Sequence, residues 1–166
     1  MNYFHKDCKV TIIESHHEIK KPISDIKVGD ILVTYDELSE EWTNKKVTKV
    51  LSDKKISDFK NILQNLGYKN IGLFTFNNLN IKFTPTTSFL TLMGWRAIYP
   101  SNDYLPYSAG TPKEVLDLND NIYKAKGYWE CINHIDFLKC NDDILYSLIV
   151  EENHSYLVDD IVVFSN

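Results

Sequence analysis

Lys21–Glu37 reads KPISDIKVGDILVTYDE, and this stretch carries the first signal of the fold. Its second half, Asp30–Tyr35 (DILVTY), is rich in β-branched and aromatic residues, which pack well on the pleated surface of a sheet. The segment therefore predicts a strand. Gly29 and Asp30 precede it and are typical of the turn that leads into a strand.

Similar segments recur on both sides of this stretch, with turn residues between them. They are Lys9–Ile13, Lys46–Leu51, Gly72–Phe76, Asn80–Phe83, Ser88–Leu92, Leu145–Glu151 and Ser155–Phe164. Within the last segment, Asp159 and Asp160 predict the tip of a hairpin, because Asp tolerates the backbone angles of a tight turn. Short, frequent strands of this kind predict an all-β fold.

One helix and one long loop interrupt the strand pattern. Ser57–Leu66 predicts a helix with Ser57 as its N-terminal cap and Gly67 at its end, so we expect a helical insertion at about 55–67. Ser101–Pro112 carries two prolines and predicts a loop at about 101–113. The length of 166 residues suits a single domain over 1–166.

The composition excludes several classes of protein. Hydrophobic residues make up 43% and charged residues 25%, which is ordinary for a folded domain. The net charge of −5 offers no attraction for a phosphate backbone, so we expect no nucleic-acid partner. The sequence shows neither the apolar core of a secretion signal nor a run of about 20 apolar residues. We therefore expect no membrane association and a cytoplasmic location, or a particle assembled there.

No metal or cofactor site is predicted. The three cysteines lack metal-type spacing and are odd in number, so we expect reduced, partly buried thiols at Cys8, Cys131 and Cys140. His16 and His17 lie in a polar stretch that predicts a loop between Ile13 and Pro22 rather than a metal site. For the tryptophans we expect core packing and loop anchoring rather than a carbohydrate platform with the tyrosines; they are Trp42, Trp95 and Trp129.

The sequence also contains a weak internal repeat. Ile23–Ile31 (ISDIKVGDI) and Glu114–Ile122 (EVLDLNDNI) share two spaced apolar residues followed by an Asp turn that leads into a strand. This pattern favours two similar β halves related by an approximate two-fold axis.

Three blocks in this order resemble the characteristic blocks of Hint (Hedgehog/intein) domains. Lys21–Glu37 is similar to the segment that follows the first strand of that family, Thr84–Trp95 (TPTTSFLTLMGW) to its second block, and Tyr146–Val163 (YSLIVEENHSYLVDDIVV) to its C-terminal block. The resemblance spans nearly the whole chain. It implies a Hint-type β fold of two pseudo-symmetric halves, here with one short inserted helix.

The resemblance also implies a chemistry. In the family a Cys or Ser at the first residue of the domain attacks the preceding carbonyl, a Thr and a His of the second block assist, and in inteins a terminal Asn then cyclises. Here the nucleophile position falls at or near Tyr3, with two residues before it, and a phenol is a poor nucleophile for an acyl shift. Cys8 is the nearest thiol, about five residues too late.

The other catalytic positions are also altered. Thr84 is retained, but Thr87 stands where the family has His, and a hydroxyl cannot exchange protons near pH 7 as imidazole does. For this pair we expect side-chain hydrogen bonds in a β-turn. His154 is retained. At the end of the chain, either Asn166 matches the terminal Asn with Ser165 before it, or Ser165 matches the Asn and Phe164 the preceding His.

Two functional hypotheses follow, with a third behind them. The first is a Hint-like module that does not cleave itself and that serves a structural or protein-binding role, because residues typical of the scaffold persist while the nucleophile and the general acid do not. The abundance of Lys, Asn and Ile suggests an AT-rich genome, and a phage or virus structural component is a concrete version of this hypothesis. The second is an autoprocessing element that uses Cys8. The third, another kind of acidic β-barrel enzyme, would need a polar pocket that the sequence does not reveal.

Overall fold

The computed structural model describes residues 2–100, 114–152 and 155–165. The described chain is mostly β-strand with one short α-helix, α1 (Lys60–Asn65), which confirms the predicted all-β class. The first strands are β1 (Phe4–His5), β2 (Lys9–Glu14), β3 (His17–Pro22), β4 (Ile31–Asp36), β5 (Glu41–Lys55), β6 (Gly72–Phe76), β7 (Phe89–Thr91) and β8 (Gly94–Ala97). The remaining strands are β9 (Glu114–Val115), β10 (Asn121–Tyr123), β11 (Trp129–Cys131), β12 (Ile135–Lys139), β13 (Ile144–Val150), β14 (Ser155–Val158) and β15 (Ile161–Phe164).

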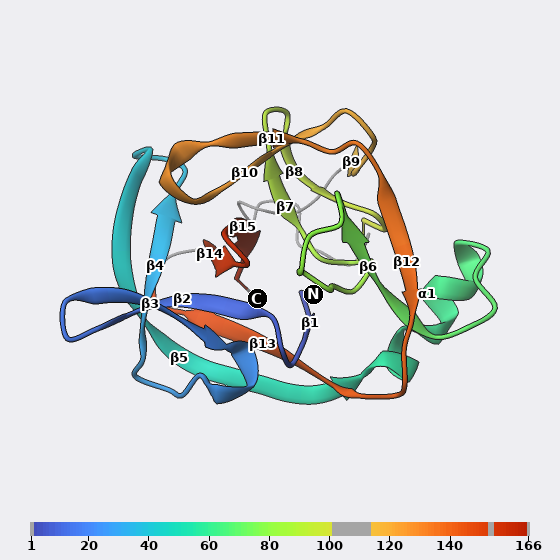
Figure 1. The fold of residues 1–166 in the computed structure, drawn as a ribbon, viewed down its shortest axis with the longest axis horizontal. Helices are drawn as coiled ribbons and strands as arrows, with labels where there is room; N and C mark the ends of the chain where they lie inside the picture. The colour runs from blue at the N-terminus through green and yellow to red at the C-terminus, as the bar shows by residue number, and fades with distance from the viewer. Residues whose placement is uncertain (1, 101–113, 153–154, 166) are drawn as a thin grey trace.

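Most strands belong to one winding sheet. Its order is β1-β13-β5-β4-β2-β14-β15-β7-β10-β11, with β3 paired to β2 and β8 joining β7 to β9. Strands β12 and β6 form a separate antiparallel pair. Figure 1 shows these strands running around a centre that holds β14, β15 and both ends of the chain, while α1 lies on the outside. Asn2 and Ser165, the first and last described residues, are both buried.

Strand β5 connects two parts of this arrangement. Its first residues, Glu41–Lys46, pair with β4 in a hairpin, and the residues from Val47 onward pair with β13. Two register shifts along β13 bend this long pairing. Only Lys46–Leu51 was expected to be strand, because the polar flanks of β5 carry little strand signal.

The predicted strands are largely confirmed. The described β2, β6, β7 and β13 match them, and Asp159 and Asp160 form the predicted tight turn between β14 and β15, with φ of 48° and 65°. The prediction of a strand at Asn80–Phe83 is wrong, since only Phe83 pairs, through isolated bridges to Phe4 and Phe74. The prediction of a loop between Ile13 and Pro22 is also wrong. Ser15 and His16 form a tight turn, and the chain continues as β3.

The helical insertion is confirmed in place but not in detail. A 3₁₀ turn at Ile56–Phe59 leads into α1, and Gly67 follows the helix with φ of +92°. Ser57 is not the cap that was expected. Its N–H and hydroxyl both donate to the Asp142 carboxylate, at 2.8 and 2.9 Å, and so tie the insertion to the segment before β13.

The first copy of the internal repeat is a turn that leads into β4. The Lys27 N–H donates to Asp30 Oδ2 at 2.8 Å, and the Asp30 N–H donates to the Lys27 carbonyl at 3.0 Å. Gly29 (φ +94°) donates to the Val47 carbonyl, and the Val47 N–H donates to the Asp30 carbonyl, both at 2.9 Å. The turn therefore also sets the register between the start of β4 and β5.

The second copy repeats every one of these hydrogen bonds in front of β10. The Asp117 N–H donates to Asp120 Oδ2 at 2.8 Å, and the Asp120 N–H donates to the Asp117 carbonyl at 3.2 Å. Asn119 (φ +72°) takes the place of Gly29, and Ile132 takes the place of Val47. The Asn119 N–H donates to the Ile132 carbonyl at 2.9 Å, and the Ile132 N–H donates to the Asp120 carbonyl at 2.8 Å. The true register therefore differs by one residue from a direct overlay of Ile23–Ile31 on Glu114–Ile122.

The core fills the space between the two halves. It centres on phenylalanines in tilted and edge-to-face contact, in which Phe83 lies 5.2 Å from Phe76 and 4.7 Å from Phe89 between ring centroids. A second cluster under α1 contains Tyr3, Ile56 and Leu145. In the part of the chain that the structure describes, no helix has the length and apolar character needed to cross a membrane.

Candidate functional site

The main chain of Tyr3 is held by the second sequence block. The Tyr3 N–H donates to Thr84 Oγ1 at 3.3 Å, and the Thr84 N–H donates to the Tyr3 carbonyl at 3.1 Å. Two residues later, the His5 N–H donates to the Lys82 carbonyl at 3.1 Å. The peptide bond between Asn2 and Tyr3 therefore lies beside the Thr84 hydroxyl, so the structure brings two of the predicted site residues together.

The Tyr3 side chain points to a different place. It is buried in the cluster under α1, 6.1 Å from the Phe59 ring, and its hydroxyl donates to Asp53 Oδ1 at 2.9 Å. Burial, the hydrogen bond to Asp53 and the negative charge of Asp53 raise the pKa of the Tyr3 phenol above its ordinary value. The phenol is thus a protonated hydrogen-bond donor in the core.

Thr84 and Thr87 close a buried turn. The Thr87 N–H donates to the Thr84 carbonyl at 3.0 Å, and the two hydroxyl oxygens lie 3.1 Å apart. Thr86 Oγ1 is 3.5 Å from Thr84 Oγ1. These are the β-turn hydrogen bonds that the sequence predicts. The hydroxyl of Thr87 occupies the position at which the resemblance implies an imidazole.

Asn2 belongs to the same site, and sequence reasoning missed it. Its side chain is buried, its Oδ1 accepts the Ser88 N–H at 3.0 Å, and its Nδ2 donates to the Phe164 carbonyl. One amide thus joins the start of the second block to the end of β15. The partners of Asn2 are 86 and 162 positions away in the sequence. Local sequence patterns do not reveal contacts over such separations.

Of the C-terminal candidates, the structure describes Ser165 but not His154 or Asn166. Ser165 is buried, and its hydroxyl accepts the Val150 N–H at 3.1 Å and donates to the Leu148 carbonyl at 3.3 Å. These two bonds tie the end of β15 to β13. His154 and Asn166 lie outside the described residues, as does the predicted loop at 101–113.

The Cys8 thiol contacts Lys82, whereas the Asn2–Tyr3 bond lies beside Thr84. Its Sγ contacts the main chain of Lys82, 3.5 Å from the carbonyl and 3.4 Å from the nitrogen. Burial raises the pKa of the Cys8 thiol to about 12, opposed by the Lys82 hydrogen bond and reinforced by the charge of Asp159. A thiol that stays protonated near neutral pH is a poor nucleophile.

Asp159 faces this thiol from the tip of the β14–β15 hairpin. Its Oδ1 accepts the Lys9 N–H at 3.3 Å, but its Oδ2 is buried without a well-formed hydrogen bond in the described structure. Burial therefore raises the pKa of the Asp159 carboxyl, and the Lys9 hydrogen bond only partly opposes that shift.

Asp159→Asn should therefore raise the melting temperature at pH 7 more than at pH 4. The folded state holds the Asp159 proton more tightly than the unfolded chain does, so wild-type stability falls as the pH rises from the unfolded pKa of about 4 through the raised folded pKa. The amide keeps the oxygen that accepts from Lys9 and removes the charge. Thermal denaturation at the two pH values measures the difference. Asp160→Asn, which loses the ion pair to Lys20, serves as the control and should show no gain at pH 7.

No metal site is evident in the described residues. His16 lies in the β2–β3 turn and His17 at the start of β3, and both are exposed. Among residues 2–100, 114–152 and 155–165, no group of three or more His, Cys, Asp or Glu side chains could hold a metal ion.

The tryptophans occupy two environments. Trp95 is buried, packs 5.4 Å from the Phe164 ring and donates its indole N–H to Glu37 Oε1 at 2.9 Å. Trp42 and Trp129 both pack against Tyr123, at 5.9 and 4.5 Å. Trp95 is therefore part of the packing, as expected, whereas Trp42 also lines a cavity at the surface.

Among the described residues, hydroxyl groups lie next to the Asn2–Tyr3 bond. A Thr hydroxyl contacts the amide nitrogen of Tyr3, but the side chain after that amide is a buried phenol and the neighbouring group is a second Thr hydroxyl. Neither supplies a nucleophile or a proton shuttle near pH 7. Hydrogen bonds to Thr84 and Ser88 fix Asn2 and Tyr3 beside the second sequence block.

Comparison with known proteins identifies the fold through structure. No family model matches the sequence, and no curated protein matches it. The crystal structure of a DnaB intein from Synechocystis sp. superposes with a TM-score of 0.70 at 17% identity, covering 100% of this chain and 99% of that chain. The intein-like domain from Clostridium thermocellum gives 0.61 at 18% identity, with 100% and 99% covered. The DnaX mini intein from Spirulina platensis gives 0.61 at 16% identity, with 99% and 100% covered. The chain therefore has the Hint fold of inteins over its full length.

Proposed function

We propose that this Hint-fold chain does not cleave itself and serves as a structural or protein-binding module. One observation carries the proposal: the peptide bond at the position expected for self-cleavage is followed by Tyr3, whose hydroxyl is bound to Asp53 in the core. The scaffold around that bond is intact, because Thr84 still contacts the Tyr3 amide. In this proposal the chain keeps the Hint fold but not the self-cleaving chemistry of this site.

The geometry of the side chain explains why Tyr cannot replace Cys or Ser here. An acyl shift needs a nucleophile one carbon away from Cα, so that attack on the preceding carbonyl closes a five-membered ring. The oxygen of Tyr3 lies at the far side of a rigid aromatic ring, and it donates to Asp53 Oδ1 at 2.9 Å. Its raised pKa also keeps it protonated.

The alternative, an autoprocessing element that uses Cys8, finds little support in the geometry. The Cys8 thiol lies beside Lys82, while the Asn2–Tyr3 bond lies beside Thr84. The pKa of the Cys8 thiol, about 12, leaves almost no thiolate at neutral pH. The fold itself is common to both alternatives, so only an activity measurement separates them.

The intact mass of a fusion protein tests the proposal. A carrier domain is joined ahead of residue 1, and the purified fusion is incubated with and without dithiothreitol. We expect the mass of the wild-type fusion to stay unchanged in both conditions, because no side chain after Asn2 can attack its carbonyl. The Cys8→Ala fusion serves as the control.

Cleavage would overturn the proposal, and the control identifies its source. Thiol-dependent cleavage that disappears in Cys8→Ala would establish Cys8 as the nucleophile. Cleavage that persists in Cys8→Ala would require another nucleophile and would equally end the claim of inactivity.

The concrete form of the binding role is a component of a phage or virus particle. Its support is the abundance of Lys, Asn and Ile, together with a Hint fold in which Tyr3 and Thr87 stand at the expected nucleophile and His positions. Mass spectrometry of particles or complexes that co-purify with the chain from its natural source tests this form. Recovery of the chain only as an isolated protein would argue against it.

A further inference from the structure

The antiparallel pairing of β7 with β15 is interrupted at one position. Val163 faces Phe89 in this pair, so one further step along the strands places Phe164 opposite Ser88. The Phe164 N–H donates to the Ser88 carbonyl at 3.1 Å. Two residues paired in this way ordinarily exchange a second hydrogen bond, here from the Ser88 N–H to the Phe164 carbonyl. In this structure both atoms bind another group instead.

The side chain of Asn2 takes the place of that second bond. Asn2 Oδ1 accepts the Ser88 N–H at 3.0 Å, and Asn2 Nδ2 donates to the Phe164 carbonyl. A primary carboxamide carries an acceptor and a donor side by side, as a peptide group does, so it can bridge two main-chain groups of opposite kind. The bridge lies where the start of the chain meets β15 at the centre of the fold, as Figure 1 shows.

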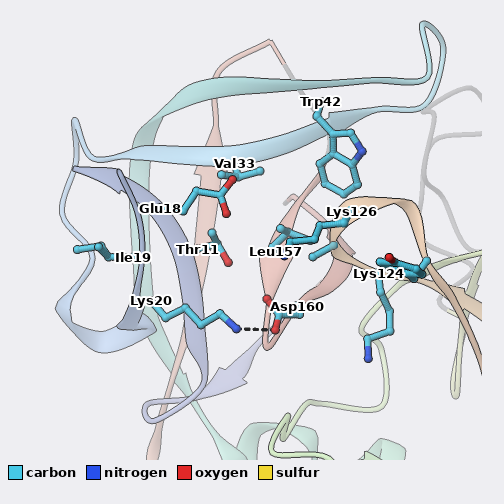
Figure 2. A pocket seen from close by; sticks show the side chains of 12 residues that line it. Thr11, Glu18, Ile19, Lys20, Val33, Trp42, Lys124, Lys126, Leu157 and Asp160 are labelled. Carbon is cyan, nitrogen blue, oxygen red and sulfur yellow. Dashed lines mark hydrogen bonds and ion pairs between the residues drawn. The ribbon is translucent and has the colours of Figure 1, made fainter. Parts of the chain in front are cut away.

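This carboxamide subsite is closed to solvent and is built from main-chain groups. Asn2 and Ser88 are each 1% exposed. By contrast, the cavity of about 590 Å³ that Thr11 and Trp42 line opens at the surface (Figure 2). The Ser88 hydroxyl is buried and forms no hydrogen bond with the described residues, so it does not hold the amide. Recognition therefore depends on one N–H and one carbonyl whose positions the sheet fixes.

These two main-chain groups select the side chain that can stand at position 2. A carboxylate could accept from the Ser88 N–H, but its second oxygen would face the Phe164 carbonyl, which is also an acceptor. An alanine would leave both buried groups without this partner, which destabilises the folded state. Glutamine carries the same carboxamide one methylene farther out, and added length in a packed interior causes strain. Asparagine meets all three requirements.

We infer that Ser88 and Phe164 form a recognition subsite for a primary carboxamide, which makes position 2 specific for asparagine. The subsite holds the residue before the Asn2–Tyr3 peptide bond, while Thr84 holds the main chain of Tyr3 after it. Asn2 is thus a positioning residue for this bond. The inference concerns recognition and not cleavage, so it goes beyond the proposed function and does not depend on it.

Asn2→Asp tests the inference with almost no change in size. At pH 7 we expect the variant to melt roughly 6 °C or more below the wild type, because it buries a carboxylate that turns an acceptor toward the Phe164 carbonyl. The folded pKa of the new carboxyl should lie above the unfolded value of about 4, so this loss appears as the pH rises. At pH 4 the protonated acid again offers an acceptor and a donor. The difference from the wild type at that pH should therefore shrink to less than half.

Thermal denaturation of both proteins at the two pH values measures this effect. Equal melting temperatures at pH 7, or the same loss at pH 7 and pH 4, would overturn the inference. Asn44→Asp makes the same chemical change on an exposed residue of β5 and should show neither effect. Ser88→Ala removes the unused hydroxyl and keeps the N–H, so adding it to Asn2→Asp should leave the pH effect in place. Loss of the effect would mean that the Ser88 side chain, and not the main chain, reads position 2.

Hydrogen exchange of the Asn2 side chain gives a second, independent measurement on the wild-type chain. We expect the Asn2 carboxamide protons to exchange with solvent at least about tenfold more slowly than those of exposed Asn44, as followed by NMR. Equal exchange rates would overturn the closed subsite. Cleavage of the fusion protein is measured separately, so a failure here leaves the proposed absence of self-cleavage standing.

Discussion

A fusion protein that carries Tyr3→Cys together with Thr87→His is expected to be cut at the Asn2–Tyr3 bond in dithiothreitol, whereas the wild-type fusion stays intact. The cysteine places a thiol one carbon from Cα beside an amide that Thr84 already holds at 3.3 Å. A His at position 87 replaces a hydroxyl that lies 3.1 Å from Thr84 Oγ1, so an imidazole would stand next to the same amide. Intact mass measures the gain, from no product to accumulation of the free carrier.

Single variants show which group is limiting. Tyr3→Cys alone should cleave slowly or not at all, and Thr87→His alone should stay intact because it has no nucleophile. Removing the buried Tyr3 ring leaves a cavity beside Phe59 that costs roughly 3–5 kcal/mol, so circular dichroism must show that the double variant is folded. A folded double variant that remains intact would mean that more than these two residues separate the site from activity.

Gly72→Ala is expected to produce the largest loss of stability among the glycines whose surroundings are known. A Cβ on Gly72 would lie 2.2 Å from the Leu138 carbonyl oxygen and 2.7 Å from Cζ of Phe137. The obstacle is backbone of the paired strand β12, so it cannot rotate aside. We expect a loss of about 3 kcal/mol, seen as a fall in melting temperature of roughly 6–12 °C.

Gly29→Ala is the matched comparison. Gly29 has φ of +94°, but no atom lies within 4 Å of the point that an added methyl group would occupy, so the variant suffers backbone strain without a clash. We expect a smaller loss of about 1–2 kcal/mol. If the two alanine variants melt at the same temperature, the close approach of β6 and β12 does not constrain the fold as described.

Strands with dense β-branched and aromatic residues could be predicted from the sequence, and the others could not. Gly72–Phe76 and the β14–β15 hairpin combine apolar runs with clear turn residues. Strand β3 (HEIKKP) and the first half of β5 are exposed and charged, so neither composition nor alternation distinguishes them from loops. Their strand conformation comes from pairing with β2 and β4, which is a tertiary effect.

The candidate site was predictable only where a sequence block carried it. Resemblance to Hint domains brought Tyr3, Thr84 and Thr87 together, and the structure places them in contact. The roles of Asn2 and Asp53 depend on partners 86 and 50 positions away in the chain, and a buried amide or carboxylate gives no local sign of such a partner. Likewise, the cavity over Thr11 is formed by strands that meet only in the folded state.

The placement of β15 between β14 and β7 also constrains how the molecule folds. Val163 pairs with Phe89 on one side and with Tyr156 on the other, and Phe4 pairs with Tyr146, so early and late segments meet inside a single sheet. Such long-range pairing slows folding, because the entropic cost of closing a long loop comes before the stabilising contacts form. During synthesis, the apolar residues of β1 and β7 therefore stay without their partner strands until β13 and β15 have left the ribosome.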